Sequence, residues 1–260
     1  MKSRRYLFLL LVVPLILASG CRSSNRIVNT GDVVENMSWA DHVGLIVGTD
    51  QFAISTNGLP DHEYLDQYIG LDLDGVSTFF TYVVESPLDI EITLNPELAD
   101  QPTYTGLNEV GLMLSGAPLY NPYEGDQVSV AQDDAFEVDG ISFFDSCWGH
   151  PSPPGSYHYH GRPVCITDIV DRPGQHSHVI GIALDGFPIY GAQGKNGKTP
   201  TDLNQCRGHI GPTPEFPGGI FHYHLIDEAP YSLICFSGEI QGYHPPTLAD
   251  IEAEFEEAQE

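Results

Sequence analysis

The tripeptide His-Tyr-His occurs twice in the chain, at residues 158–160 and 222–224. Side chains two positions apart on an extended strand point to the same face, so each copy presents two imidazoles side by side. Neutral imidazole is a good ligand for Zn²⁺, Cu²⁺, Ni²⁺ and Fe²⁺. If the two pairs meet, at least four nitrogen donors converge on one point. The spacing therefore predicts a site for a divalent transition metal.

Each triplet lies in the same local frame. A Cys-x-Gly-His segment that ends at His150 precedes the first copy, and one that ends at His209 precedes the second. A second cysteine follows each copy. A histidine repeated in register with a pair of potential ligands is itself a ligand candidate. The predicted metal ligands are His158, His160, His222, His224, His150 and His209.

The duplication extends beyond the histidines. Residues 111–120 and 181–190 share the pattern G-x-x-L-x-G-x-P-x-Y, and the two patterns begin 70 positions apart. Cys165 and Cys235 are also 70 positions apart, as expected of a duplicated supersecondary unit. Two copies are too few for a solenoid. We therefore expect two pseudo-symmetric halves that face each other, with the histidine motifs near the shared axis.

Two features break this symmetry. Asp185 stands in the second pattern where the first has Ser115. An Asp-Gly turn explains this aspartate structurally, which is the preferred interpretation. A carboxylate beside a histidine-bound metal would instead serve as general base for a water molecule, and Asp185 is the one catalytic candidate. Residues 176–178, His-Ser-His, form a third pair without a counterpart, which we expect on the surface rather than in a site.

The N-terminus has the composition of an export signal. Basic residues in the first five positions are followed by an apolar run and then by small residues before Cys21, a pattern typical of a cleaved signal peptide. A cysteine directly after small residues resembles a bacterial lipobox. We therefore expect a signal peptide at residues 1–20, lipid attached to Cys21, and a tether over residues 21–31. Arg22, rather than aspartate, after the cysteine favours the outer membrane.

Four cysteines remain after this leader, two in each copy. An oxidising compartment favours disulfides, and four cysteines allow three pairings. The duplication favours Cys147 with Cys165 and Cys206 with Cys235, so that each bridge closes a loop around its own His-Tyr-His. Zinc bound by these cysteines is the weaker alternative because no C-x-x-C spacing exists. With the thiols in disulfides and few methionines present, the predicted ion is copper or zinc in the divalent state.

The charge of the chain limits its partners. The formal net charge is −26, and no lysine or arginine occurs between Arg26 and Arg162. Nucleic acid is excluded as a partner because phosphate binding needs a positive field. We expect contact with the lipid bilayer through the N-terminal anchor only. Solvation in salty water explains the acidic surface, and attraction of cations is compatible with it.

The pattern between these motifs predicts the fold class. Short period-2 or β-branched runs at residues 77–84, 89–94, 127–130 and 179–184 are typical of strands, and Gly- and Pro-rich turns separate them. Only residues 246–260 have a helical pattern, with an acidic polar face. The sequence therefore predicts a mostly β, sandwich-like or irregular domain over residues 32–245, built from two pseudo-repeats and followed by a short C-terminal helix.

These motifs together resemble the YHYH domain family. Residues 157–160 read Tyr-His-Tyr-His, and residues 221–224 repeat the motif with Phe221 in place of the leading tyrosine. The resemblance covers residues 105–242 and supports the importance of the motif, but it implies no activity. The function has therefore to be argued from the residues.

Three functions fit these observations. The expected one is a lipid-anchored protein of the cell envelope that binds a divalent transition metal through the paired His-x-His motifs. The second is a metal-dependent hydrolase or oxidoreductase that uses the same site, which requires an open coordination position. The third is a structural or adhesive module without metal, in which the histidines pack a disulfide-braced loop.

Overall fold

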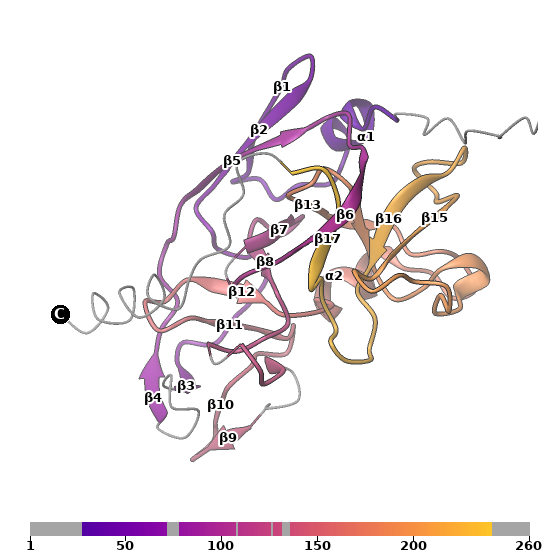
Figure 1. Cartoon of the computed structure of the whole chain (residues 1–260). Coiled ribbons are helices and arrows are strands. Elements are labelled where there is room, and N and C mark those ends of the chain that lie inside the picture. The colour runs from indigo at the N-terminus through magenta and orange to yellow at the C-terminus, as the bar shows by residue number, and fades with distance from the viewer. Residues whose placement is uncertain (1–27, 72–77, 108, 126, 132–135, 241–260) are drawn as a thin grey trace, which may run out of the picture.

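A computed structural model describes residues 28–71, 78–107, 109–125, 127–131 and 136–240 of the chain (Figure 1). The expected signal peptide, the lipidated Cys21 and the expected helix at residues 246–260 lie outside the described residues. No helix within the described part has the length and apolar character that a membrane crossing requires.

The protein is mostly β, as expected from the sequence, and its strands form one large sheet and several small ones. The large sheet has eight strands in the order β11 (Gly149–Pro151), β12 (Tyr157–Tyr159), β8 (Pro118–Tyr120), β7 (Glu109–Met113), β13 (Val179–Ala183), β14 (Pro188–Tyr190), β16 (Ile220–His224) and β15 (Gly208–Gly211). A three-stranded sheet comprises β1 (Gly44–Val47), β2 (Gln51–Thr56) and β5 (Leu88–Thr93).

Three strand pairs and a few short helices complete the described elements. The pairs are β3 (Tyr68–Leu71) with β4 (Thr78–Thr81), β6 (Leu98–Tyr104) with β17 (Cys235–Gly238), and β9 (Glu137–Val138) with β10 (Ile141–Ser142). The helices are α1 (Gly31–Glu35), α2 (Val164–Val170) and the 3₁₀ turn η2 (Lys195–Gly197). The architecture is that of an irregular β domain.

The large sheet is pseudo-symmetric about the junction of β7 and β13. From that junction outward, the first half runs β7, β8, β12, β11 and the second runs β13, β14, β16, β15. The pairings correspond too, because β8 lies parallel to β12 and β14 lies parallel to β16. Figure 1 shows β11 and β12 on one side of the central strands and β15 and β16 on the other. The duplicated unit of the sequence is thus half of one continuous sheet.

The G-x-x-L-x-G-x-P-x-Y pattern builds the two central hairpins. The second glycine of each pattern turns the chain with positive φ, 91° at Gly116 and 86° at Gly186, a conformation that favours glycine. The first glycines lie where β7 and β13 meet. A Cβ at Gly111 would lie 2.6 Å from the carbonyl oxygen of Ile182, and one at Gly181 equally close to that of Leu112. Both glycines therefore permit the close approach that joins the halves.

Side-chain alternation places aromatic rings and imidazoles on opposite faces of the outer strands. Tyr157 and Tyr159 on β12 belong to the main apolar core, as do Phe221 and Tyr223 on β16. The histidines between and after them project from the other face of the same strands. The three-stranded sheet packs over the centre of the large sheet, where Leu112 and Ile182 join its apolar cluster. The central tyrosine of each His-Tyr-His therefore packs in the core, while its two histidines lie on the opposite face of the sheet.

Two predictions from the sequence were wrong. Residues 127–130 form no strand among the described elements, and Gln127 has a φ of 58°, which interrupts extended structure. The histidine motifs do not lie near the shared axis. Four strands, β8, β7, β13 and β14, separate β12 from β16, because the glycine-rich hairpins occupy the centre of the sheet.

Candidate metal centres

The first cluster of histidines lies at the β11–β12 edge of the large sheet. His150 on β11 is paired in register with His158 on β12, and His160 directly follows β12. All three side chains are buried, and one ring nitrogen from each lies within 4.8 Å of the others. Three imidazoles from two short adjacent strands therefore converge without a contribution from the second half.

Hydrogen bonds fix the protonation of two of these rings. Nδ1 of His158 lies 3.0 Å from the carbonyl oxygen of Ser156, and Nδ1 of His160 lies 2.5 Å from that of Asn121. A carbonyl oxygen only accepts, so both Nδ1 atoms carry the proton and both Nε2 atoms present a lone pair. These two Nε2 atoms lie 2.9 Å apart. Two facing lone pairs at this distance repel each other unless a proton or a metal ion lies between them.

Burial argues against a proton as that cation at neutral pH. It holds the pKa of His158 well below its ordinary value, with the neighbouring His160 adding to the effect, and it lowers the pKa of His160 to about 4. His150 is similarly shifted by burial and then by its two histidine neighbours, so its pKa is also far below normal. Nε2 of His150 is buried and has no hydrogen-bond partner among the described residues. Three neutral imidazoles that face one another offer the nitrogen donors that divalent transition metals bind.

The second cluster repeats this arrangement at the other end of the sheet. His209 on β15 is paired in register with His222 on β16, and His224 ends the same strand. Nδ1 of His222 bonds to the carbonyl of Ile220 at 3.0 Å, and Nδ1 of His224 bonds to that of Gly191 at 2.7 Å. The Nε2 atom of His222 lies 3.1 Å from those of both His209 and His224. Burial lowers the pKa of His222 to about 3 and that of His224 to about 2.

The second cluster also receives a fourth imidazole. His176 lies in the segment before β13, and one of its ring nitrogens lies within 4.8 Å of those of His222 and His224. Its Nδ1 donates to the carbonyl of Ser177 at 2.7 Å, so its Nε2 carries a lone pair like those of its neighbours. The expectation that residues 176–178 lie on the surface was thus wrong for His176. His178 points elsewhere, because its Nδ1 pairs with Glu215 at 2.8 Å.

Two carboxylates distinguish the second cluster further. Asp202 accepts a hydrogen bond from Nδ1 of His209 at 2.9 Å, and this bond holds the pKa of the exposed carboxyl below its ordinary value. A carboxylate behind a ligating imidazole is a common supporting group in metal sites. Glu215 binds His178 through Oε1, while its buried Oε2 has no hydrogen-bond partner among the described residues. No sequence pattern singled out either carboxylate.

The Cys-x-Gly-His segments shape both clusters in the same way. The residue before each glycine takes positive φ, 65° at Trp148 and 71° at Arg207. A Cβ at Gly149 would lie 2.0 Å from the hydroxyl of Tyr157, and one at Gly208 would lie 2.2 Å from the ring of Phe221. The aromatic residue that begins each Tyr/Phe-His-Tyr-His motif therefore lies over the glycine of the neighbouring strand. This contact sets the histidines of the two strands side by side.

The predicted disulfides are confirmed. Cys147 is bonded to Cys165 and Cys206 to Cys235, with Cα–Cα distances of 5.1 and 4.8 Å. Each bridge closes the loop that contains its own His-Tyr-His, as the duplication predicted. His62 lies near the first bridge, but disulfide sulfurs are not thiolates and do not form a thiolate metal site.

The aspartate that begins the turn of the first Cys-x-Gly-His segment is replaced by an asparagine in the second. Asp145 accepts backbone hydrogen bonds from Cys147 and Gly149, and Asn204 accepts the equivalent bonds from Cys206 and Gly208. Asp145 also accepts the hydroxyl of Tyr157 at 2.7 Å. The second half has Phe221 without a hydroxyl at that position, so an amide replaces the carboxylate.

Asp185, the catalytic candidate from the sequence, belongs to the opposite face of the sheet. It is fully buried and accepts hydrogen bonds from the hydroxyl of Tyr223 and from the backbone of Gly238. Burial raises its pKa to about 6, against the lowering effect of these hydrogen bonds. Tyr223 alternates with the histidines on β16, so Asp185 lies on the side away from the second cluster. This placement supports the structural interpretation of its turn.

All six predicted ligands lie in clusters, although the expected single centre is wrong. Imidazoles that the duplication predicted to converge once instead converge twice, in groups that share no residue. The first group is His150, His158 and His160, and the second is His209, His222 and His224 with His176 added.

The stability of the metal-free protein should fall steeply in acid. The buried histidines have lower pKa values in the folded chain, about 4 for His160 and about 2 for His224, than the ordinary 6.5 of the unfolded chain. Between these values the unfolded chain binds more protons, so stability is complete above pH 6.5 and declines as the pH falls below it. Each such histidine should cost about 1.4 kcal/mol per pH unit in this window.

Urea denaturation of chelator-treated protein between pH 7.5 and 4.5 measures this decline. A His224→Gln variant lacks one of the titrating groups and should show a shallower dependence on pH. A stability that stays constant over this range would contradict the buried, neutral state of the clusters.

Comparison with known families gives one match. Residues 89–201 match the family described as YHYH protein. The match begins before the expected residue 105 and ends before the second His-Tyr-His, so it contains the first cluster and His176 but not the strands β15 and β16. No curated protein and no solved structure matches the chain.

Proposed function

Residues 89–201 match the family described as YHYH protein, and from that premise we propose that the protein binds two divalent transition-metal ions, one at each histidine cluster. The proposal refines the expected function, since it assigns a separate ion to each pseudo-symmetric half. It also retains the expected setting, in which lipid on Cys21 anchors the chain to the cell envelope at the outer membrane. The bilayer would then be contacted through that anchor only.

One observation carries the proposal. Oxygen acceptors bind the Nδ1 atoms of His158 and His160 in the first cluster and those of His209, His222 and His224 in the second. The Nε2 atoms of neighbouring rings consequently face each other at 2.9–3.1 Å. Metal-ligating histidines typically donate their other ring N–H to a carbonyl or carboxylate, which orients the ring and fixes its tautomer. A purely structural role explains the carbonyl bonds. It does not explain why the Nε2 lone pairs of five rings are turned toward one another.

The donor set favours copper or zinc. The clusters supply nitrogen alone, and both disulfides remove the thiolates that would favour softer ions. Bonds of about 2.0–2.1 Å to a tetrahedral ion separate two ligand nitrogens by roughly 3.3 Å. The Nε2 separations of 2.9–3.1 Å are slightly shorter, so small ring movements would admit the ion.

The test is the metal content of the mature protein. The protein is secreted to an oxidising compartment, purified without a nickel resin, offered excess Zn²⁺ or Cu²⁺, desalted, and analysed by mass spectrometry for metals. We expect two ions per chain. A His178→Gln variant, altered outside both clusters, should keep both ions. If the unaltered protein retains no more metal than a His160→Gln/His224→Gln double variant, metal binding by the clusters is refuted.

Catalysis at the second cluster is the alternative that a specific observation favours. His176 and His209 are only partly buried. The carboxylate of Glu215, whose Oε2 has no hydrogen-bond partner within the described part of the chain, lies nearby, since its charge acts on His176. A carboxylate next to a metal with an open position can serve as general base for a water molecule. Azide added to Co²⁺-loaded protein distinguishes the functions. An open position should give a changed visible spectrum, whereas a cluster closed by four imidazoles should give none.

A further inference from the structure

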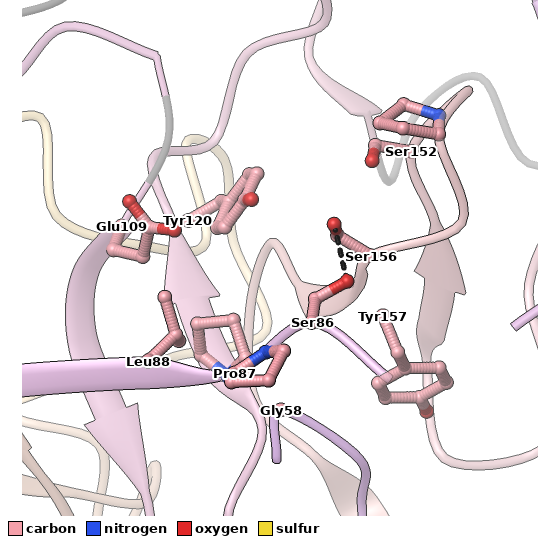
Figure 2. Close-up of a pocket in the computed structure, with 11 residues that line it drawn as sticks. Gly58, Ser86, Pro87, Leu88, Glu109, Tyr120, Ser152, Ser156 and Tyr157 are labelled. Atoms are coloured by element: carbon pink, nitrogen blue, oxygen red, sulfur yellow. Dashed lines mark hydrogen bonds between the residues drawn. The ribbon is translucent and has the colours of Figure 1, made fainter. Parts of the chain in front are cut away.

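A pocket of about 240 Å³ lies beside the first cluster but outside it (Figure 2). This volume is below the roughly 300–1,000 Å³ typical of drug-sized ligands, so the pocket suits a small molecule. Figure 2 shows Glu109 and Tyr120 together on one side and the serine hydroxyls on the other. The residues that line it include Ser86, Pro87, Glu109, Pro118, Tyr120 and Ser156.

The walls of this pocket are held in place by the first cluster and by the N-terminal part of the chain. The ring of Tyr120 stacks on His158 with centroids 4.0 Å apart and planes inclined by 15°. The hydroxyl of Ser156 bonds to that of Ser86 at 2.7 Å, while the carbonyl of Ser156 accepts Nδ1–H of His158. The pocket is thus preformed by contacts on several elements, which lowers the cost of ordering a ligand.

The polar character of the lining favours a cation. Glu109 carries the only charged side chain among the described residues that line the pocket. Glu109 on β7 pairs in register with Tyr120 on β8, so a carboxylate and an aromatic ring lie side by side on one face. A ring face attracts ammonium groups, and the formal net charge of −26 concentrates cations around the chain.

The pair of a carboxylate and an aromatic ring occurs in the first half of the sheet and not at the equivalent positions of the second. The position of Glu109 in β7 corresponds to Val179 in β13, 70 residues later, although Tyr190 repeats Tyr120. Residues of the segment that precedes the duplicated units, among them Gly58 and Leu88, close one side of the pocket. The carboxylate and the covering segment therefore occur together at the first half.

We propose that this pocket binds a small organic ammonium cation, with Glu109 and Tyr120 as its recognition groups. The carboxylate neutralises the ligand, the ring of Tyr120 contacts its N-methyl or methylene groups, and the hydroxyls of Ser86 and Ser156 accept or donate hydrogen bonds to a polar substituent. Proline rings supply apolar contact around the ammonium group. The proposal goes beyond metal binding and needs no ion in either cluster.

Calorimetric titration of chelator-treated full-length mature protein with choline tests the pocket independently of the metal. The neutral isostere 3,3-dimethylbutan-1-ol has the shape of choline without its charge. We expect choline to bind at least about tenfold more tightly than the isostere, corresponding to about 1.4 kcal/mol. Equal affinities, or no heat with choline and ethanolamine alike, would overturn the proposal.

Two variants assign the binding to the pocket. Glu109→Gln keeps the shape of the side chain and should weaken choline binding about tenfold or more, while Glu35→Gln, an exposed control on α1, should not change it. In NMR spectra, choline should change the chemical shifts of Ser86 and Ser156 in the unaltered protein but not in Glu109→Gln. Unchanged affinity in Glu109→Gln would place any binding elsewhere and refute the assignment. Loss of metal binding without loss of choline binding would refute only the metal proposal.

Discussion

Replacing His160 with glutamine should leave a protein that binds one metal ion instead of two. The amide fills much of the imidazole volume but offers no comparable nitrogen donor, and the first cluster has only three histidines. Loss of a supporting group behind a ligand already costs roughly 10–100-fold in affinity, so loss of the ligand itself should cost at least about 100-fold at that cluster. Competition with a chromophoric chelator measures the affinity of each remaining ion.

The reciprocal variant provides the control. His224→Gln should remove the ion of the second cluster and leave the first, because four strands of the sheet separate the two groups. A single shared centre would instead lose all its metal in either variant. Retention of both ions at unchanged affinity in His160→Gln would show that the first cluster is not a metal site.

Removing the disulfide of the second half should destabilise the chain by about 2–5 kcal/mol. Cys206 and Cys235 are both buried in the main core, so alanine is the suitable replacement because serine would add an unsatisfied hydroxyl. The bridge ties the segment before β15 to β17 and closes a loop that contains all of β16. The Cys206→Ala/Cys235→Ala variant should therefore show a lower free energy of unfolding in urea.

Metal content shows which half of the protein the loss of a disulfide affects. In that variant, the affinity of the second cluster should fall because β15 and β16 lose their brace, whereas the first cluster keeps its own bridge. The Cys147→Ala/Cys165→Ala variant should show the opposite distribution. A loss below about 1 kcal/mol in both variants would mean that strand pairing alone holds the loops.

The local features of the fold could be predicted from the sequence. Alternation along a strand determined that His158 and His160 share a face, and the repeated spacing determined the pairing of the four cysteines. These features depend on residues within one repeat. They need no knowledge of how distant strands are ordered.

The long-range features could not be predicted in this way. The separation of the clusters follows from the junction of β7 with β13, and that pairing rests on contacts between Gly111 and Gly181 and the facing carbonyls. The sequence pattern marks these glycines without naming their partners. His176 reaches the second cluster through the path of an irregular segment, for which residue spacing provides no rule. Residues 127–130 have strand propensity, but the chain turns there.

The exchange of a carboxylate for an amide makes the two halves unequal in the substitutions that they permit. Asn204 is exposed, so Asn204→Asp keeps an oxygen acceptor for the backbone N–H groups of Cys206 and Gly208 without burying a charge. Asp145 is buried, so Tyr157→Phe would remove a hydrogen-bond donor from a carboxylate that water reaches poorly. The same turn is therefore tolerant of exchange in the second half and intolerant of it in the first.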